Sequence, residues 1–263
     1  MTIKPKKLYL VDGANLVFRA FYAIRGLSNS KGFPTNALYG FAQMLLKLIK
    51  DEAPTHIAVV FDTPEPTFRD EMYEEYKAGR KEPPDDLAQQ FPYVMPLVEA
   101  LGIPHVELPG YEADDLIGTI AKKYAGTGCD VVMVSGDKDF MQLVGDHISI
   151  LDTMKDRRIG PKEVEERFGV GPERVIDVLG LSGDSSDNIP GLPGVGPKTA
   201  MKLIQEFGSI DELIAHADKL KPAIRAKLED NLDLLKLSRD LVTIKIDVEL
   251  GCDLADLVRR DPP

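Results

Sequence analysis

The sequence contains no tryptophan, only two cysteines and no long apolar run. Cys129 and Cys252 lie far apart and form no C-x-x-C pair, so neither a disulfide framework nor a thiolate zinc site is indicated. No apolar stretch approaches the roughly 20 residues of a membrane span, and residues 1–7 lead directly into a short strand rather than a signal peptide. We therefore expect a soluble protein of a reducing cytoplasm, without a membrane partner.

An excess of basic residues is also absent. The chain has 32 lysines and arginines against 43 aspartates and glutamates, which gives a formal net charge of −11. Proteins that bind a phosphate backbone usually show a basic excess, so the composition by itself argues against a nucleic-acid partner. That argument is weak if the acids are clustered around divalent cations, because bound cations reverse the local charge.

Apolar strands alternate with amphipathic helices in the first part of the chain, which predicts the α/β class with a mostly parallel central sheet flanked by helices. After residue 160 helices replace strands. We expect a first domain over residues 1–165 and a helical region over residues 166–263. The expected strands cover residues 7–11, 56–61, 103–107, 130–134 and 148–151, and the clearest helices cover 37–49 and 94–101.

Acidic side chains follow four of these strands, at the point where each strand ends. One such acid is most simply a helix cap or a turn former. The carboxyl ends of parallel strands share one edge of a sheet, so all four groups should meet there, and their repulsion requires cations. The acids expected at this edge are Asp12, Asp62, Glu112, Asp114, Asp115, Asp137 and Asp139.

The expected ligands are all oxygen atoms. The four histidines, His56, His105, His147 and His216, fall outside the acidic loops, and no thiolate accompanies them. Hard oxygen ligands favour Mg²⁺ or Mn²⁺ over zinc.

Cationic and aromatic residues alternate between the second strand and the helix at 94–101. Arg69, Tyr73, Tyr76 and Arg80 recur at spacings of four, three and four, which predicts one helical face, with Lys77 and Lys81 beside it. Such a face would suit a nucleic-acid strand through phosphate pairing and base stacking. A solvated helix whose cations are balanced by neighbouring glutamates explains the pattern equally well.

A polar loop with two further acids, Asp184 and Asp187, precedes a glycine-rich turn between two expected helices. Exposed backbone N–H groups at a helix N-terminus can hold a phosphate without reading bases, although a glycine hairpin can also serve only packing. The residues that we expect to contact DNA here are Gly191, Gly194, Gly196, Lys198, Thr199 and Lys202.

Six separated strings carry a resemblance: VDGAN, FD, GYEADD, SGDKD, GDSSDN and GLPGVGPKTA. In order and spacing they resemble the 5′ nuclease family of flap endonucleases and 5′→3′ exonucleases, in its branch linked to bacterial DNA polymerase I, from about residue 8 to 242. The resemblance implies a PIN-like metal-binding core, a helical arch over about 64–92, and a helix-three-turn-helix DNA-binding element.

The resemblance also implies roles for single residues. It assigns Asp115 and Asp184 as ligands through water, and Tyr76 as the arch aromatic that meets DNA. We also expect Lys81, beside the cationic face, to contact DNA. A K⁺ ion is implied at the glycine hairpin. Pro197, Gly79 and the pair Lys81-Glu82 depart from the family pattern and affect only the fit of hairpin and arch. The implied ligands are Asp12, Asp62, Glu112 and Asp114 for one metal and Asp137, Asp139 and Asp187 for a second; the implied phosphate-binding residues are Arg19, Lys77 and Arg80.

The function implied is two-metal hydrolysis of phosphodiester bonds, with 5′-phosphate and 3′-hydroxyl products. The expected partners are DNA with 5′ flaps, nicks or 5′ overhangs, RNA-primed DNA, and a C-terminal polymerase domain of the same parent chain. A monomer in the bacterial cytoplasm, at the nucleoid, is expected. Two alternatives stay open: a non-catalytic module that binds DNA junctions, and a metal-dependent phosphatase for small molecules, which would have no use for the hairpin.

Overall fold

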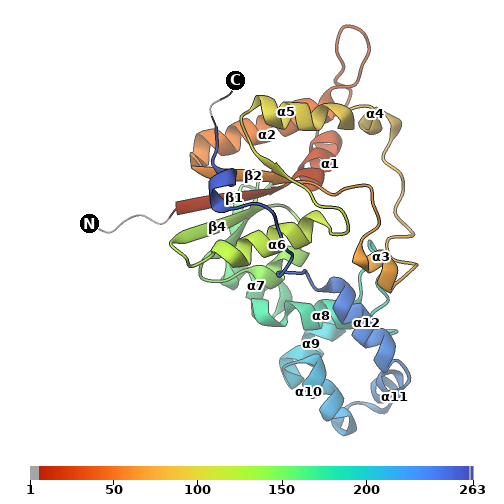
Figure 1. Cartoon of the computed structure of the whole chain (residues 1–263). Helices are drawn as coiled ribbons and strands as arrows, with labels where there is room; N and C mark the ends of the chain where they lie inside the picture. Colours follow the sequence, from red (N-terminus) through yellow and green to blue (C-terminus); the bar gives the residue numbers. More distant parts are fainter. Residues whose placement is uncertain (1–5, 261, 263) are drawn as a thin grey trace.

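The computed structural model describes residues 6–260 and 262, and its centre is a six-stranded sheet in the order β3-β2-β1-β4-β5-β6 (Figure 1). The first five strands in the chain pair in parallel, as predicted, and only β6 is antiparallel. The unpredicted β6 is short and begins with two arginines, so no apolar pattern marks it. The strands are β1 (Lys6–Asp12), β2 (His56–Val60), β3 (His105–Val106), β4 (Cys129–Val134), β5 (Ile148–Asp152) and β6 (Arg157–Ile159).

Alternate residues of the strands point to opposite faces of the sheet, and helices cover the apolar side chains on both faces. In β1, Tyr9 and Val11 join the core beneath α1 (Gly13–Ala23), α2 (Asn36–Glu52) and α5 (Val94–Ala100). Leu8 and Leu10 join the core on the other face, against α6 (Ala113–Tyr124). The α/β class with a parallel sheet flanked by helices is confirmed.

The segment at 64–92 differs from the prediction of a helical arch. It contains only α3 (Phe68–Met72), α4 (Asp85–Ala88) and the 3₁₀ turn η1 (Phe91–Tyr93), and residues 73–84 form turns and coil. The consecutive prolines Pro83 and Pro84 disfavour a helix before α4, and Lys77 has a φ of 56°. The predicted helical face from Arg69 to Arg80 is therefore wrong.

Helices form most of the chain beyond β6, as predicted. They share a hydrophobic core with the sheet face that packs on α6, so the division at residue 165 stays a prediction. The elements are α7 (Pro161–Phe168), η3 (Pro172–Arg174), α8 (Val175–Ser182), α9 (Pro197–Phe207), α10 (Ile210–Ala215), η4 (Ala217–Lys219), α11 (Pro222–Asp230), α12 (Leu232–Val242) and η5 (Leu254–Leu257).

After α12 the chain returns to the sheet. This return segment, residues 243–260, is called the strap below. Its amides at Ile244 and Val248 donate to Gln142 Oε1 and Thr119 Oγ1, at 2.9 and 3.2 Å. Farther along, Val258 forms an antiparallel bridge with His56 in β2. No local sequence pattern marks this path. Within the part of the chain that the structure describes, no helix has the length and apolar character needed to cross a membrane.

Candidate metal centre at the carboxyl edge of the sheet

Asp12 and Asp62 lie at the carboxyl ends of the neighbouring strands β1 and β2. Asp12 is buried and caps α1 by accepting the Asn15 N–H at 3.0 Å, and its second oxygen accepts the Ser135 hydroxyl at 2.8 Å. Asp62 accepts the Ala113 N–H at 2.8 Å, at the start of α6. These bonds fix both carboxylates at the same sheet edge.

Five of the predicted acids line one pocket of about 210 Å³ at this edge: Asp12, Asp62, Glu112, Asp114 and Asp137. Glu112 and Asp114 come from the start of α6, and Asp137 follows β4. Lys77 and Arg80 line the same pocket. The structure therefore brings together acids from four strand ends, as the parallel sheet predicts.

Burial and mutual repulsion shift the pKa values of this cluster. Burial and the charges of Asp137 and Asp62 raise the pKa of Asp12 to about 7. Burial and the charges of Asp12 and Asp137 raise the pKa of Asp114 well above its usual value. Cations would relieve this repulsion.

Three further acids lie beside the pocket. Asp139 lies at the start of η2 (Asp139–Leu143), where burial and the charge of Asp137 raise its pKa to about 7. Its Oδ1 atom is buried without a hydrogen-bond partner in the described structure, although the ammonium group of Lys138 lies 3.8 Å away. Asp184 and Asp187 belong to the loop after α8, and their negative charges also raise the pKa of Asp139. An orphaned carboxylate oxygen among other carboxylates fits a hard cation.

Basic side chains contact the same acids. Lys77 binds Glu112, and Arg80 binds Asp187 at 2.6 Å. Lys138 binds Asp184, and although burial opposes it, this ammonium group lowers the pKa of that carboxyl. In this arrangement, no group of three or more His, Cys, Asp or Glu side chains among residues 6–260 and 262 is placed to hold one metal ion. Lys138 was not singled out from the sequence, because a lysine within SGDKD looks like a solvated charge.

Arg19 lies on α1 and binds Asp152 at the end of β5, at 3.0 Å. It packs so closely on Gly136 that a Cβ there would lie 2.3 Å from Nη1 of Arg19. Asp152 is a buried acid that the sequence analysis missed. Its position after the fifth expected strand was the available signal.

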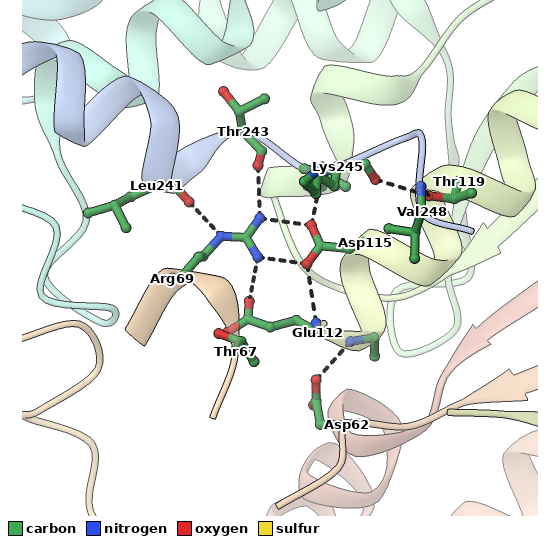
Figure 2. A network of polar contacts seen from close by, with 12 residues as sticks. Asp62, Thr67, Arg69, Glu112, Asp115, Thr119, Leu241, Thr243, Lys245 and Val248 are labelled. Carbon is green, nitrogen blue, oxygen red and sulfur yellow. Dashed lines mark hydrogen bonds and ion pairs between the residues drawn. The ribbon is translucent and has the colours of Figure 1, made fainter. Parts of the chain in front are cut away.

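Two predicted site residues are buried rather than presented to a ligand. Tyr76 is 6% exposed and donates its hydroxyl to Glu112 at 3.2 Å, so it presents little ring surface to a base, and its contact with DNA stays a prediction. Asp115 is fully buried and pairs with Arg69 instead of lining the pocket (Figure 2). The remaining arch residue, Lys81, is exposed.

The glycine turn lies between α8 and α9. Gly194 and Gly196 are exposed, as are Lys198 and Lys202, and Thr199 is half-buried. Gly191 is different, because it is buried and donates its N–H to Ser238 Oγ at 3.0 Å. A Cβ at Gly191 would lie 2.4 Å from the nitrogen of Gly183, so glycine is required there for packing. The predicted DNA contact of Gly191 is wrong.

Comparison with known proteins fits this arrangement. The profile described as "5'-3' exonuclease, N-terminal resolvase-like domain" matches residues 7–169, and "5'-3' exonuclease, C-terminal SAM fold" matches residues 170–263. The chain belongs to the 5′-3′ exonuclease family. A 5′-3′ exonuclease of Aquifex aeolicus is 42% identical over 258 residues, which cover 98% of this chain and 88% of that protein.

The 5′-3′ exonuclease family includes parts of longer proteins. DNA polymerase I of Thermus filiformis is 46% identical over 259 residues, 98% of this chain but only 31% of the polymerase. The chain spans about a quarter to a third of the polymerase relatives it matches. A phage T5 5′-exonuclease solved with zinc superposes with a TM-score of 0.77 at 27% identity, over 90% of this chain and 89% of the phage chain.

Proposed function

We propose that this 5′-3′ exonuclease is a structure-specific nuclease that cleaves DNA at 5′ flaps and 5′ ends, and removes RNA primers, in replication and repair. The products are a 5′-phosphate and a 3′-hydroxyl. The observation that carries the proposal is the pocket in which five acids from four strand ends lie beside Lys77 and Arg80. A relative also supports the proposal. The flap endonuclease of phage T5, solved as a pseudo-enzyme-product complex with DNA and metal ions, superposes on this chain with a TM-score of 0.75 at 26% identity.

The acids of the pocket and the three acids beside it hold two divalent ions, Mg²⁺ or Mn²⁺. Such ions lower the pKa of a bound water and neutralise charge on the phosphate. The orphaned oxygen of Asp139 and the raised pKa values of Asp12 and Asp114 support cations at this edge. The proposed ligands are Asp12, Asp62, Glu112 and Asp114 for one ion, and Asp137, Asp139 and Asp187, with Asp184 through water, for the other.

The basic side chains of the chain bind the scissile phosphate. Lys77 and Arg80 line the pocket, and each now binds one of its acids. Because a cation at those acids would compete with both contacts, the two side chains can turn to the phosphate oxygens and stabilise the charge that develops there. Arg19, whose Nη1 is buried without a hydrogen-bond partner in the described structure, orients the phosphate from α1.

The exposed glycine turn holds the backbone of the duplex. Gly196 leaves room for a phosphate at the start of α9, and the ammonium group of Lys227 lies against Gly194. Lys198 and Lys202 add positive charge one turn apart. Such contacts position DNA without reading sequence, so specificity arises from the shape of the substrate. A K⁺ ion at this turn, a monomeric state, a cytoplasmic location and a polymerase domain in the same parent chain belong to the proposal.

One assay distinguishes this proposal from its alternatives. The chain is incubated with a 5′-flap duplex and with a chromogenic phosphomonoester, each with Mg²⁺ and with EDTA, beside the variant Asp137→Asn. We expect cleavage of the flap at its junction that EDTA and the variant abolish, and no ester hydrolysis. Ester hydrolysis without flap cleavage would indicate a phosphatase, and tight flap binding without cleavage a junction-binding module.

A further inference from the structure

Arg69 lies in α3 and is only 2% exposed, yet every N–H of its guanidinium group has an acceptor (Figure 2). An arginine carries five such donors. Nε donates to the Leu241 carbonyl at 2.9 Å, and Nη2 donates to the Thr243 carbonyl and to Asp115 Oδ1, both at 2.8 Å. Nη1 donates to Asp115 Oδ2 at 2.7 Å and to Glu112 Oε2 at 3.4 Å.

Both carboxylate oxygens of Asp115 are also fully hydrogen-bonded. Its Oδ1 accepts from Arg69 Nη2 and from the backbone N–H of Lys245 at 2.8 Å. Its Oδ2 accepts from Arg69 Nη1 and from the backbone N–H of Glu112 at 3.2 Å. A carboxylate offers about four lone-pair sites, so Asp115 has none left for a water on a metal ion. The sequence resemblance assigns it that water, and the geometry points to another role.

The pair joins three parts of the chain that are distant in sequence. Arg69 belongs to the segment that carries Lys77 and Arg80, Asp115 belongs to the first turn of α6, and Lys245 belongs to the strap. Figure 2 shows the three segments meeting at the guanidinium group. Only a planar, bidentate donor can serve carboxylate and carbonyl acceptors together in this way, which a lysine ammonium cannot do.

We infer that Arg69 and Asp115 are positioning residues that fix the Glu112 carboxylate between the pocket and the segment that carries Lys77 and Arg80, with the strap as the third anchor. The pair holds Glu112 at two points, through its N–H by Asp115 and through Oε2 by Arg69, and the same carboxylate also accepts from Tyr76 and Lys77. The inference rests on the proposed metal-binding role of Glu112. It predicts that neither Arg69 nor Asp115 positions Glu112 without the other, so the loss of either residue has the same effect as the loss of both.

The test uses Asp115→Asn, Arg69→Gln and the double variant, with Glu52→Gln as a matched control. Glu52 also accepts from an arginine, Arg158 at 3.1 Å, but lies outside the pocket. Single-turnover flap cleavage is measured over a series of Mg²⁺ concentrations, at a temperature where circular dichroism shows every variant folded. Arg69→Lys is measured beside Arg69→Gln, so that one arginine variant remains if the other does not fold.

We expect each single variant to raise the half-saturating Mg²⁺ concentration and to lower the maximal rate. The ratio of maximal rate to half-saturating concentration should fall by about 10- to 100-fold, as for other residues that orient metal ligands. The double variant should be no worse than either single one, because the pair acts as a unit. Glu52→Gln should behave as wild type. If Arg69→Gln and Arg69→Lys match wild type while Asp115→Asn raises the Mg²⁺ requirement, or if the single effects multiply, the inference is overturned.

Hydrogen exchange separates this inference from the proposed function. The amides of Lys245 and Glu112 donate to Asp115, so both should exchange faster in Asp115→Asn than in wild type or Glu52→Gln. If the wild-type chain does not cleave the flap, the proposed function fails, while faster exchange at these two amides would still support the positioning pair. Unchanged exchange would contradict it.

Discussion

The backbone N–H of Lys77 donates to the carbonyl oxygen of Asp187 at 2.9 Å, although the two residues are 110 positions apart in sequence. A second bond lies beside it, from Asn188 Nδ2 to the Glu75 carbonyl at 2.7 Å. Two hydrogen bonds therefore join the segment that carries Lys77 to the acidic loop after α8. These bonds hold Lys77, a proposed phosphate-binding residue, close to Asp187, a proposed metal ligand.

Replacing Asn188 should weaken this connection. Asn188→Gly loses the bond to Glu75 and should cost about 1 kcal/mol of unfolding free energy. Asn188→Ala should cost roughly 1 kcal/mol more, because the residue has a φ of 56°, which a Cβ disfavours. Urea denaturation measures both. Equal stability of the two variants and wild type would show that the bond does not hold the loop.

Removing the basic side chains at the pocket should slow cleavage more than it weakens DNA binding. Lys77→Met and Arg80→Met should each lower the single-turnover rate by about 100-fold, the scale of lost electrostatic stabilisation at a phosphate. Lys162→Met is the control, because Lys162 is 82% exposed on α7. Rates at saturating enzyme and affinities from fluorescence anisotropy separate the two effects. A loss of affinity with an unchanged rate would assign both residues to binding alone.

The charge of the exposed glycine turn should appear in the salt dependence of binding. Lys198→Ala should weaken binding of duplexes of any sequence equally and reduce the slope of log K against log salt by about 1. Anisotropy titrations over a range of KCl concentrations measure the slope. An unchanged slope, or a loss that depends on sequence, would exclude a backbone contact by Lys198.

Without divalent ions, stability should depend on pH through Asp139. Its pKa is raised to about 7 in the folded chain, so its contribution to stability is present below its unfolded pKa near 3.8 and is lost as the pH rises through 7. Wild type in EDTA should therefore lose stability relative to Asp139→Asn between about pH 4 and pH 7, by at least about 1.4 kcal/mol, the value of one pKa unit. Denaturant unfolding at each pH measures the difference.

Magnesium ions provide the control for this pH effect. If a cation binds the Asp139 carboxylate, Mg²⁺ should stabilise wild type at pH 8 and reverse the difference from Asp139→Asn. A difference that is independent of both pH and Mg²⁺ would contradict the placement of Asp139 in a repulsive cluster.

The strands and the meeting of acids at one edge could be predicted because both follow from local patterns. Apolar runs mark the strands, and parallel pairing then places Asp12, Asp62 and Asp137 together whatever the details of packing. The pairing of Arg69 with Asp115 could not be predicted, because it depends on a contact 46 positions apart and on the Leu241 and Thr243 carbonyls, which no periodicity marks.

The segment at 64–92 shows where local periodicity fails. Arg69, Tyr76 and Arg80 have helical spacing, but each is held by a tertiary partner, respectively Asp115, Glu112 and Asp187. Their spacing reflects three separate contacts and not one helical face. Gly191 misled for a similar reason, because its close approach to Gly183 cannot be distinguished in sequence from an exposed turn glycine.

Anomalous scattering from crystals grown with Mn²⁺ tests the central claim most directly. We predict two ions at the carboxyl edge of the sheet, one bound by Asp12 and Asp114 and the other by Asp139 and Asp187, with Asp115 still paired to Arg69. Crystals at saturating Mn²⁺ that show no anomalous peak among these carboxylates would contradict the account.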